Sequence, residues 1–178
     1  MAKRILIILG TARRQNTNTL VEAFARGATE AGHLVETISI GSKLIHGCFG
    51  CDACRTYDAP CVQNDDMTPL YAKVEAADVL VFASPIYYGS LTSQTKAFID
   101  RLYCYGNPAK KESALLLTAG GGGGKNTDSA VSTYFMAAEY LNLEDKGTLL
   151  AEHVSSEEDV LAHPAYEEAY LFGKSIGA

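Results

Sequence analysis

Short apolar runs alternate along the chain with segments in which apolar residues recur every three or four positions. The runs lie at 3–9, 34–40, 78–83, 114–118 and 148–154. Runs of this length are typical of strands buried on both faces in a parallel sheet. Helical spacing predicts helices at about 18–31, 65–74, 91–102, 131–141 and 165–176, the last preceded by a capping-box pattern at 155–158. Five strands alternating with five helices predict an α/β fold, a three-layer sandwich around a five-stranded parallel sheet.

The expected sheet also predicts where a ligand binds. In an open parallel sheet, ligands lie beyond the carboxyl ends of the strands, where the strand order reverses. With the order 2-1-3-4-5, this point lies between the first and third strands. The chain, 1–178, is interpreted as a single domain, and residues 41–66 show no apolar period, which indicates a functional insertion.

The segment after the first strand turns abruptly polar. Its side chains suit a monophosphate, and the first N–H groups of the following helix have no partners and lie at the positive end of the helix dipole. The segment lacks the glycine patterns of dinucleotide and ATP sites. A polar surface turn that caps the helix is the alternative. The candidate ligand-binding residues are Thr11, Arg13, Asn16, Thr17, Asn18 and Thr19.

The loops after the third and fourth strands are equally unusual. The first of them offers two tyrosine rings and a glycine, which suit a planar heterocycle; aromatic packing at the sheet edge or in a dimer interface is the alternative. Its candidates are Pro85, Ile86, Tyr87, Tyr88, Gly89 and Ser90. The second runs into five consecutive glycines, whose bare N–H groups could bind a ring edge unless the loop is a flexible lid or linker. Its candidates are Thr118, Ala119, Gly120 and Gly121.

These loops carry a family resemblance. The segments 10–13 with 16–19, 84–90 and 118–121, together with Gln94, Lys96, Phe98, Asp100 and Arg101, resemble the NADPH-dependent FMN reductase-like branch of the flavodoxin-like flavoproteins over about 3–141. The resemblance implies that the first loop holds the FMN phosphate, that 85–90 wrap the ribityl chain and isoalloxazine, and that 118–121 flank the ring. Ala12 stands where many relatives carry proline, which loosens the turn but leaves the donors.

Four of the five cysteines are bunched in the insertion. Cys48, Cys51, Cys54 and Cys61 are separated by two, two and six residues. They resemble the compact cysteine motif of the iron-sulfur flavoproteins in the same branch, which implies a [4Fe-4S] cluster. The alternatives are zinc, a shell without metal, and a redox disulfide between neighbours such as Cys48 and Cys51. Cys104 is interpreted as a small buried apolar residue, and the four histidines share no ligand spacing.

Charge and composition narrow the partners. The net charge of -6 argues against nucleic acid. No stretch approaches the ~20 apolar residues of a membrane helix, and the run after Lys3 and Arg4 is too short for a signal peptide. We therefore expect a cytoplasmic protein, in which cysteines serve as thiols or metal ligands.

Three functions are consistent with these residues. The first is an NAD(P)H-dependent FMN-linked oxidoreductase that reduces a small acceptor such as a quinone, a nitro compound or free flavin. The second is an iron-sulfur flavoprotein that carries electrons from ferredoxin through a cluster and FMN. The third is a non-enzymatic nucleotide-binding module. Because the flavin site would be open near Tyr87 and Tyr88, we expect a homodimer or homotetramer.

Overall fold

The computed structural model describes residues 1–57, 60–105, 110–156 and 158–177. Their strands form a five-stranded parallel sheet in the order β2-β1-β3-β4-β5, which confirms the predicted topology. The strands are β1 (Arg4–Leu9), β2 (Leu34–Ser39), β3 (Val79–Pro85), β4 (Lys111–Thr118) and β5 (Leu143–Ala151).

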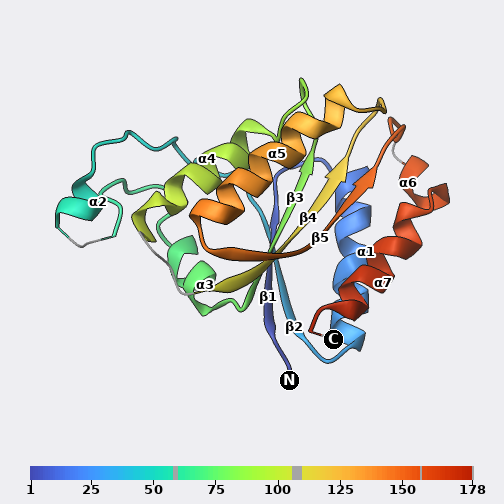
Figure 1. Cartoon of the computed structure of the whole chain (residues 1–178), viewed down its shortest axis with the longest axis horizontal. Helices are drawn as coiled ribbons and strands as arrows, with labels where there is room; N and C mark the ends of the chain where they lie inside the picture. Colours follow the sequence, from blue (N-terminus) through green and yellow to red (C-terminus); the bar gives the residue numbers. More distant parts are fainter. Residues whose placement is uncertain (58–59, 106–109, 157, 178) are drawn as a thin grey trace.

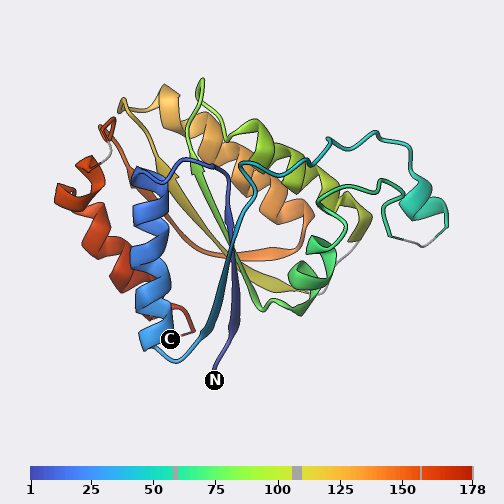
Figure 2. The same ribbon diagram turned by 180° about the vertical axis from the view of Figure 1, so that it is seen from behind.

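Helices cover both faces of this sheet, as Figures 1 and 2 show from opposite sides. One face carries α1 (Asn16–Glu30), α6 (Asp159–Ala162) and α7 (Ala165–Ser175). The other carries α3 (Leu70–Ala76), α4 (Ser93–Arg101) with the 3₁₀ turn η1 (Leu102–Tyr105), and α5 (Lys125–Tyr140). The described residues of the insertion 41–66 form an arm that projects away from the sheet (Figure 1). The short helix α2 (Ala53–Thr56) lies at the tip of this arm.

The apolar runs supply side chains to both layers in alternation. In β1, Ile5 and Ile7 face α1 and α7, whereas Leu6 and Ile8 face α3, α4 and α5. Helices α1 and α7 cross in close contact at Gly173. A Cβ at this position would lie only 2.0 Å from the carbonyl oxygen of Phe24. Each face of β1 is therefore buried against one layer of helices.

Two strands begin earlier than the sequence predicted. β4 starts at Lys111 instead of Ala114, and β5 starts at Leu143 instead of Thr148 and ends at Ala151 instead of Val154. Both strands carry charged residues near their start, and β5 is in addition an edge strand with alternating exposure. An edge strand alternates apolar and polar residues, so a search for unbroken apolar runs misses its beginning.

Helix boundaries also differ from the prediction. α1 begins at Asn16, two residues early, and α3 begins only at Leu70 because residues 66–69 form a turn. The predicted last helix, 165–176, corresponds to α7, whereas the short helix α6 was not predicted; Pro164 lies between the two. The capping pattern is real, but Asp159 supplies the carboxylate: it accepts hydrogen bonds from the N–H groups of residues 155 and 156 at 2.7 Å each.

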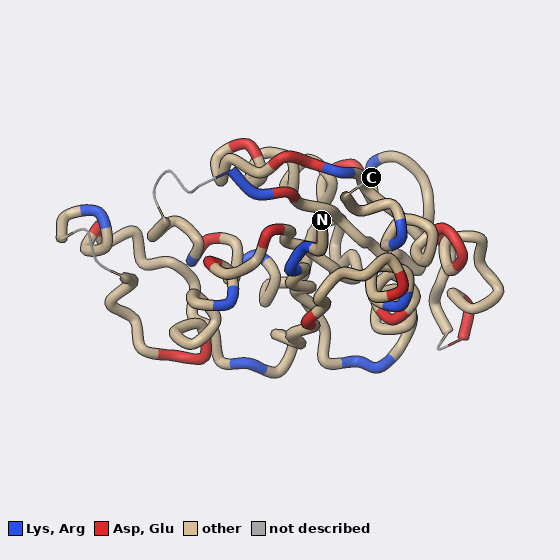
Figure 3. The backbone as a smooth tube through the Cα atoms, turned by 90° about the horizontal axis from the view of Figure 1, so that it is seen from below, with Lys and Arg blue, Asp and Glu red and all other residues tan. Residues whose placement is uncertain are grey.

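Charges of both signs are interspersed along the backbone seen in Figure 3. At the amino ends of the strands they form ion pairs: Lys3 contacts Glu112 at 2.7 Å, and Lys146 contacts both Glu112 at 3.3 Å and Glu144 at 2.7 Å. Among the described residues, no helix is long and apolar enough to cross a membrane.

Candidate functional site

The exits of β1 and β3 lie against each other at the carboxyl edge of the sheet. The N–H of Gly10 donates to the carbonyl of Ala83 at 2.7 Å, and the Thr92 hydroxyl at the start of α4 donates to the carbonyl of Gly10 at 2.8 Å. A Cβ at Gly10 would lie 1.9 Å from Oγ1 of Thr95. Only glycine fits here, and its small size lets the loop after β1 begin where the strand order reverses.

A cavity of about 220 Å³ opens at this point. All three predicted loops contribute to it, so residues from distant parts of the sequence meet in one place. Sites for whole small molecules are typically about 300–1,000 Å³, so this cavity suits the phosphate-bearing tail of a ligand whose ring lies outside it. Its lining residues are Thr11, Arg13, Gln15, Asn16, Thr17, Pro85, Ile86, Tyr87, Thr118, Gly120, Val154 and Ser155.

The amino terminus of α1 points its backbone into the cavity. The N-cap residue, Gln15, makes no side-chain capping hydrogen bond, which leaves N–H groups of the first turn for another acceptor. The Thr11 hydroxyl accepts a hydrogen bond from the N–H of Arg13 at 3.1 Å, and the exposed Arg13 side chain lines the rim. Helix N–H groups plus one guanidinium are suited to binding a phosphate.

Two of the predicted binders have structural partners. The Asn16 amide donates to the carbonyl of Ser156 at 2.6 Å and accepts from the N–H of Val160 at 3.1 Å. The hydroxyl of Thr17 shares a buried 2.6 Å hydrogen bond with that of Thr118. These side chains line the cavity but chiefly join α1 to β4 and to the segment before α6.

Two others do not line the cavity at all. The Asn18 amide donates to Glu22 at 2.6 Å along the outside of α1, and the Thr19 hydroxyl donates to the carbonyl of Gln15 at 3.4 Å.

The loop after β3 is a tight hairpin. Tyr87 and Ser90 exchange backbone hydrogen bonds of 3.0 and 3.1 Å, with Tyr88 and Gly89 at φ +50° and +73° between them. Positive φ at both central residues is the geometry of a type I′ turn, so Gly89 serves the turn. Tyr87 is half-exposed at the cavity, whereas Tyr88 is fully exposed. The N–H of Ile86 donates to the carbonyl of Thr118 at 2.8 Å, which joins this loop to β4.

The glycine loop after β4 is anchored to the segment after β5. Ala119 donates to Ala151 at 2.8 Å and accepts from Val154 at 3.0 Å, and Gly123 donates to the Glu152 carboxylate at 2.9 Å. The hydroxyl of Ser155 donates to the carbonyl of Gly120 at 3.2 Å. These bonds argue against a free lid.

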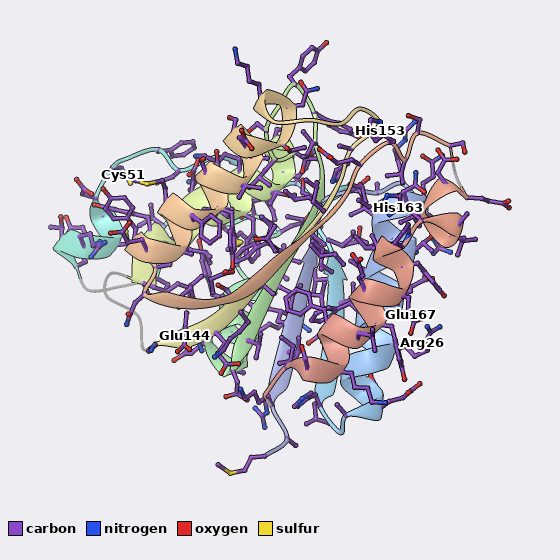
Figure 4. The ribbon with its side chains drawn as sticks, turned by 45° about the vertical axis from the view of Figure 1, so that its right-hand side comes forward. Arg26, Cys51, Glu144, His153, His163 and Glu167 are labelled. Atoms are coloured by element: carbon purple, nitrogen blue, oxygen red, sulfur yellow. The ribbon has the colours of Figure 1, made fainter. Side chains whose placement is uncertain are left out.

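The glycines follow from this close attachment. A Cβ at Gly122 would lie 2.3 Å from the imidazole of His153, which Figure 4 shows beside the end of β5. Gly123 and Gly124 have φ of +91° and +42°, which disfavour residues with a Cβ.

Sequence reasoning missed the contribution of the segment after β5. Val154 and Ser155 line the cavity, although 155–158 was interpreted only as a helix cap. No motif marks these residues; the signal available was topological, because β5 must end beside β4 in the predicted strand order.

The cysteine arm lies on another side of the molecule, where Figure 4 labels Cys51. Cys48 and Cys51 are exposed, Cys54 and Cys61 are half-buried, and all are free thiols. In the part of the chain that the structure describes, no three metal-ligating side chains already converge on one point. The four thiols would have to be drawn together by the group they bind.

Cys104 departs from its interpretation as a small buried apolar residue. It is half-buried, and burial together with the nearby Cys54 and Cys61 raises the pKa of its thiol. The structure therefore places a fifth sulfur beside the arm.

A buried ion pair lies at the base of the arm, where the segment before the cysteines meets the segment after them. Arg101 contacts Asp65 at 2.6 Å, with side chains 0% and 2% exposed. Burial raises the pKa of Asp65, but hydrogen bonds from Arg101, His46 and Met67 outweigh it and lower the pKa to about 2. The carboxylate is therefore charged at neutral pH.

The residues present fit an iron-sulfur cluster by two observations. The donor set is four thiols with short spacings, which is the chemistry such clusters require. In addition, Nε of Arg101 and Oε1 of Gln63, both at the base of the arm, are buried without a hydrogen-bond partner. Buried polar atoms are normally satisfied, so orphaned ones mark a place where a further group would lie.

The fold and the position of the cavity together define the class: a flavodoxin-like α/β protein with a cavity at the strand switch point. Residues 3–152 match the model of the NADPH-dependent FMN reductase family, and the chain belongs to this family.

The curated relatives that match are iron-sulfur flavoproteins. One from Archaeoglobus fulgidus is 41% identical over 101 residues, which are 56% of this chain and 46% of that protein. One from Methanosarcina thermophila is 37% identical over 99 residues, which are 55% of this chain and 51% of that protein. The match thus spans about half the length of these relatives.

Solved structures show the same fold. An NAD(P)H:quinone oxidoreductase from Methanothermobacter marburgensis superposes with a TM-score of 0.74 at 16% identity, covering 100% of this chain and 98% of that chain. An FMN-dependent NADH-azoreductase from Bacillus anthracis, solved with FMN, has a TM-score of 0.73 at 13% identity and full coverage of both chains, 100% each.

Proposed function

We propose that this chain binds FMN and acts as an NAD(P)H-dependent oxidoreductase that passes electrons to a small acceptor. The observation that carries the proposal is the cavity between β1, β3 and β4, into which the uncapped amino terminus of α1 and Arg13 both face. Family membership and the flavin-dependent oxidoreductases among the solved neighbours support it.

Each part of the site has its own task in this proposal. The first-turn N–H groups of α1, Thr11 and Arg13 would hold the phosphate, and Tyr87 would flank the ring at the half-open rim. The N–H groups of Gly120 and Gly121 in the glycine loop would donate to the ring edge, where they would stabilise negative charge. When bound, FMN supplies the hydride and electron chemistry, so the protein needs only to position and polarise it.

The test compares two neighbouring arginines. Arg13 lines the cavity and Arg14 does not, and both are exposed. The loss of a charge-assisted hydrogen bond of about 1.5–3 kcal/mol predicts that Arg13→Ala weakens FMN binding by roughly 10–100-fold. Arg14→Ala should bind as the unchanged chain does, and neither change should affect riboflavin, which lacks the phosphate. Flavin fluorescence measures both affinities, and NADPH should bleach the bound flavin anaerobically.

Equal FMN affinity of the two variants would remove the phosphate assignment. A colourless protein that cannot take up added FMN would leave only a non-enzymatic nucleotide-binding module.

A second candidate is an electron carrier that uses a [4Fe-4S] cluster and FMN in series, supplied by ferredoxin. The thiols and the orphaned polar atoms at the base of the arm favour it, as do the names of the curated relatives. Iron and acid-labile sulfide, measured per chain after anaerobic purification, separate the two: their absence with FMN retained excludes the carrier. Zinc would appear as metal without sulfide.

We also propose a cytoplasmic homodimer or homotetramer with no nucleic-acid partner. Fully exposed Tyr88 and half-exposed Tyr87 beside the cavity support a second chain that covers the flavin. Sedimentation of the FMN-loaded protein as a monomer would refute the assembly.

A further inference from the structure

Arg101, the last residue of α4, is completely buried although it carries a permanent charge. Its Nη1 donates to Oδ2 of Asp65 at 2.6 Å and to the carbonyl of His46 at 3.0 Å, and its Nη2 donates to Oδ1 of Asp65 at 3.3 Å. Burial of an ion pair gives little net stability, because desolvation offsets the attraction. Stability alone is therefore a weak reason for this arginine.

The hydrogen bonds of Arg101 reach residues at both ends of the loop that carries the four cysteines. His46 comes two residues before Cys48, and Asp65 comes four residues after Cys61. The Asp65 carboxylate also accepts a hydrogen bond from the backbone N–H of His46 at 3.0 Å. The segments before and after the cysteines therefore both contact the ion pair between Arg101 and Asp65. The Gln63 amide adds a bond to the carbonyl of Gly47 at 3.1 Å. The guanidinium thus binds both ends of the loop that contains all four thiols, beside direct bonds between the two ends at Leu44 and Asp66.

Arg101 still has one donor unused. Its Nε is buried without a partner, which costs about 1–3 kcal/mol when left uncompensated. This donor lies at the base of the loop that carries the four thiols, because the same guanidinium binds His46 and Asp65. Thiolate sulfur accepts hydrogen bonds, and such bonds tune iron-sulfur centres.

We propose that Arg101 is the positioning residue of the four-cysteine centre: it binds both ends of the loop and leaves its buried Nε–H for a sulfur of the centre. The inference rests on the iron-sulfur form of the proposed function. It also gives α4 a double role, since Thr92 caps its first turn against Gly10 at the flavin cavity and Arg101 ends it at the arm. The nine residues of this helix span about 14 Å.

The test is Arg101→Lys, which keeps the charge but loses the planar fork that reaches two acceptors at once. The matched control is Lys96→Ala with Asp100→Ala, an exposed 2.6 Å ion pair on the same helix. Each protein is reconstituted anaerobically with ferrous iron and sulfide, and iron, sulfide and FMN are measured per chain. Hydrogen exchange of residues 44–48 and 61–66 in the metal-free protein reports loop closure directly.

We expect Arg101→Lys to lower cluster affinity by about 10–100-fold, as removal of partners of metal ligands does, with FMN binding unchanged. Exchange at both ends of the loop should accelerate, and the control should match the unchanged chain in every readout. If Arg101→Lys also loses FMN, Asp65→Asn decides by the same measurements, since it keeps the buried shape.

The inference would be overturned if Arg101→Lys bound iron and sulfide and exchanged hydrogen at the loop ends as the unchanged chain does. The same result in Asp65→Asn would overturn it where that variant decides. An unchanged chain that binds FMN but no iron would overturn it too, while leaving the oxidoreductase proposal intact. A chain that takes up iron and sulfide but no FMN would refute the flavin proposal and leave Arg101 in its role.

Discussion

Replacement of Gly10 by alanine should damage the protein more than any exposed glycine would. A Cβ there would lie 1.9 Å from Oγ1 of Thr95, and ordinary contact begins near 3.4 Å, so the hydroxyl must retreat by about 1.5 Å (3.4 − 1.9). The backbone cannot yield instead, because Gly10 is bonded to Ala83 at 2.7 Å and to Thr92 at 2.8 Å.

The size of the effect follows from what Thr95 loses. Its side chain is fully buried, and rotation away from Gly10 breaks its 2.8 Å hydrogen bond with the Thr92 hydroxyl. Overpacking costs about 1–3 kcal/mol and a broken buried hydrogen bond about 1 kcal/mol more. We expect Gly10→Ala to lower the free energy of unfolding by roughly 2–4 kcal/mol, a large share of a typical 5–15 kcal/mol.

Urea unfolding of the FMN-free protein, followed by circular dichroism, measures this free energy. The added change Thr95→Ala removes the colliding hydroxyl, so the double variant should recover about 1–3 kcal/mol in a double-mutant cycle. Gly47→Ala is the control, since nothing lies within 4 Å of its Cβ position. A Gly10→Ala protein as stable as the Gly47→Ala protein, or a cycle without coupling, would refute the close contact of β1, β3 and α4.

Three further predictions concern other contacts. The free energy of unfolding should fall by roughly 2 kcal/mol as the pH drops from about 4 towards 2, because the pKa of Asp65 is lowered to about 2 in the folded chain. The Asp65→Asn variant should lack this loss in an acid titration. Thr118→Val should cost about 1–3 kcal/mol by leaving the Thr17 hydroxyl without its partner, whereas the double change Thr17→Val with Thr118→Val should recover most of it in thermal unfolding. Gly173→Ala should lower stability by about 1–3 kcal/mol, because the Cβ would meet the backbone of α1; unchanged thermal unfolding would contradict the close helix crossing.

The sequence predicted the strand order and the location of the cavity because both depend on simple periodicity. Ile5 to Leu9 form an unbroken apolar run, and a strand buried on both faces requires one. The polar loops then had to gather at the carboxyl edge. Thr11, Arg13 and Tyr87, chosen from distant loops, do line one cavity.

Side-chain partners could not be predicted in the same way. Asn16 is a plausible phosphate ligand by chemistry, yet its amide binds Ser156 and Val160, which lie about 140 residues later. Asp65 lies where the sequence predicts the start of a helix, but its carboxylate binds a buried arginine 36 residues away. Long-range pairing of this kind depends on packing, which no local pattern encodes.

The attachment of the cavity to the segment after β5 has a consequence for synthesis of the protein. Val154 and Ser155 line the cavity, and Ser156 and Val160 hold the start of α1 through Asn16. While the ribosome is still making β4, the nascent chain therefore has α1 but not the residues that hold its first turn. The cavity can be completed only after about residue 160 has emerged, and the face of β1 that α7 covers stays without its partner until α7 has emerged as well.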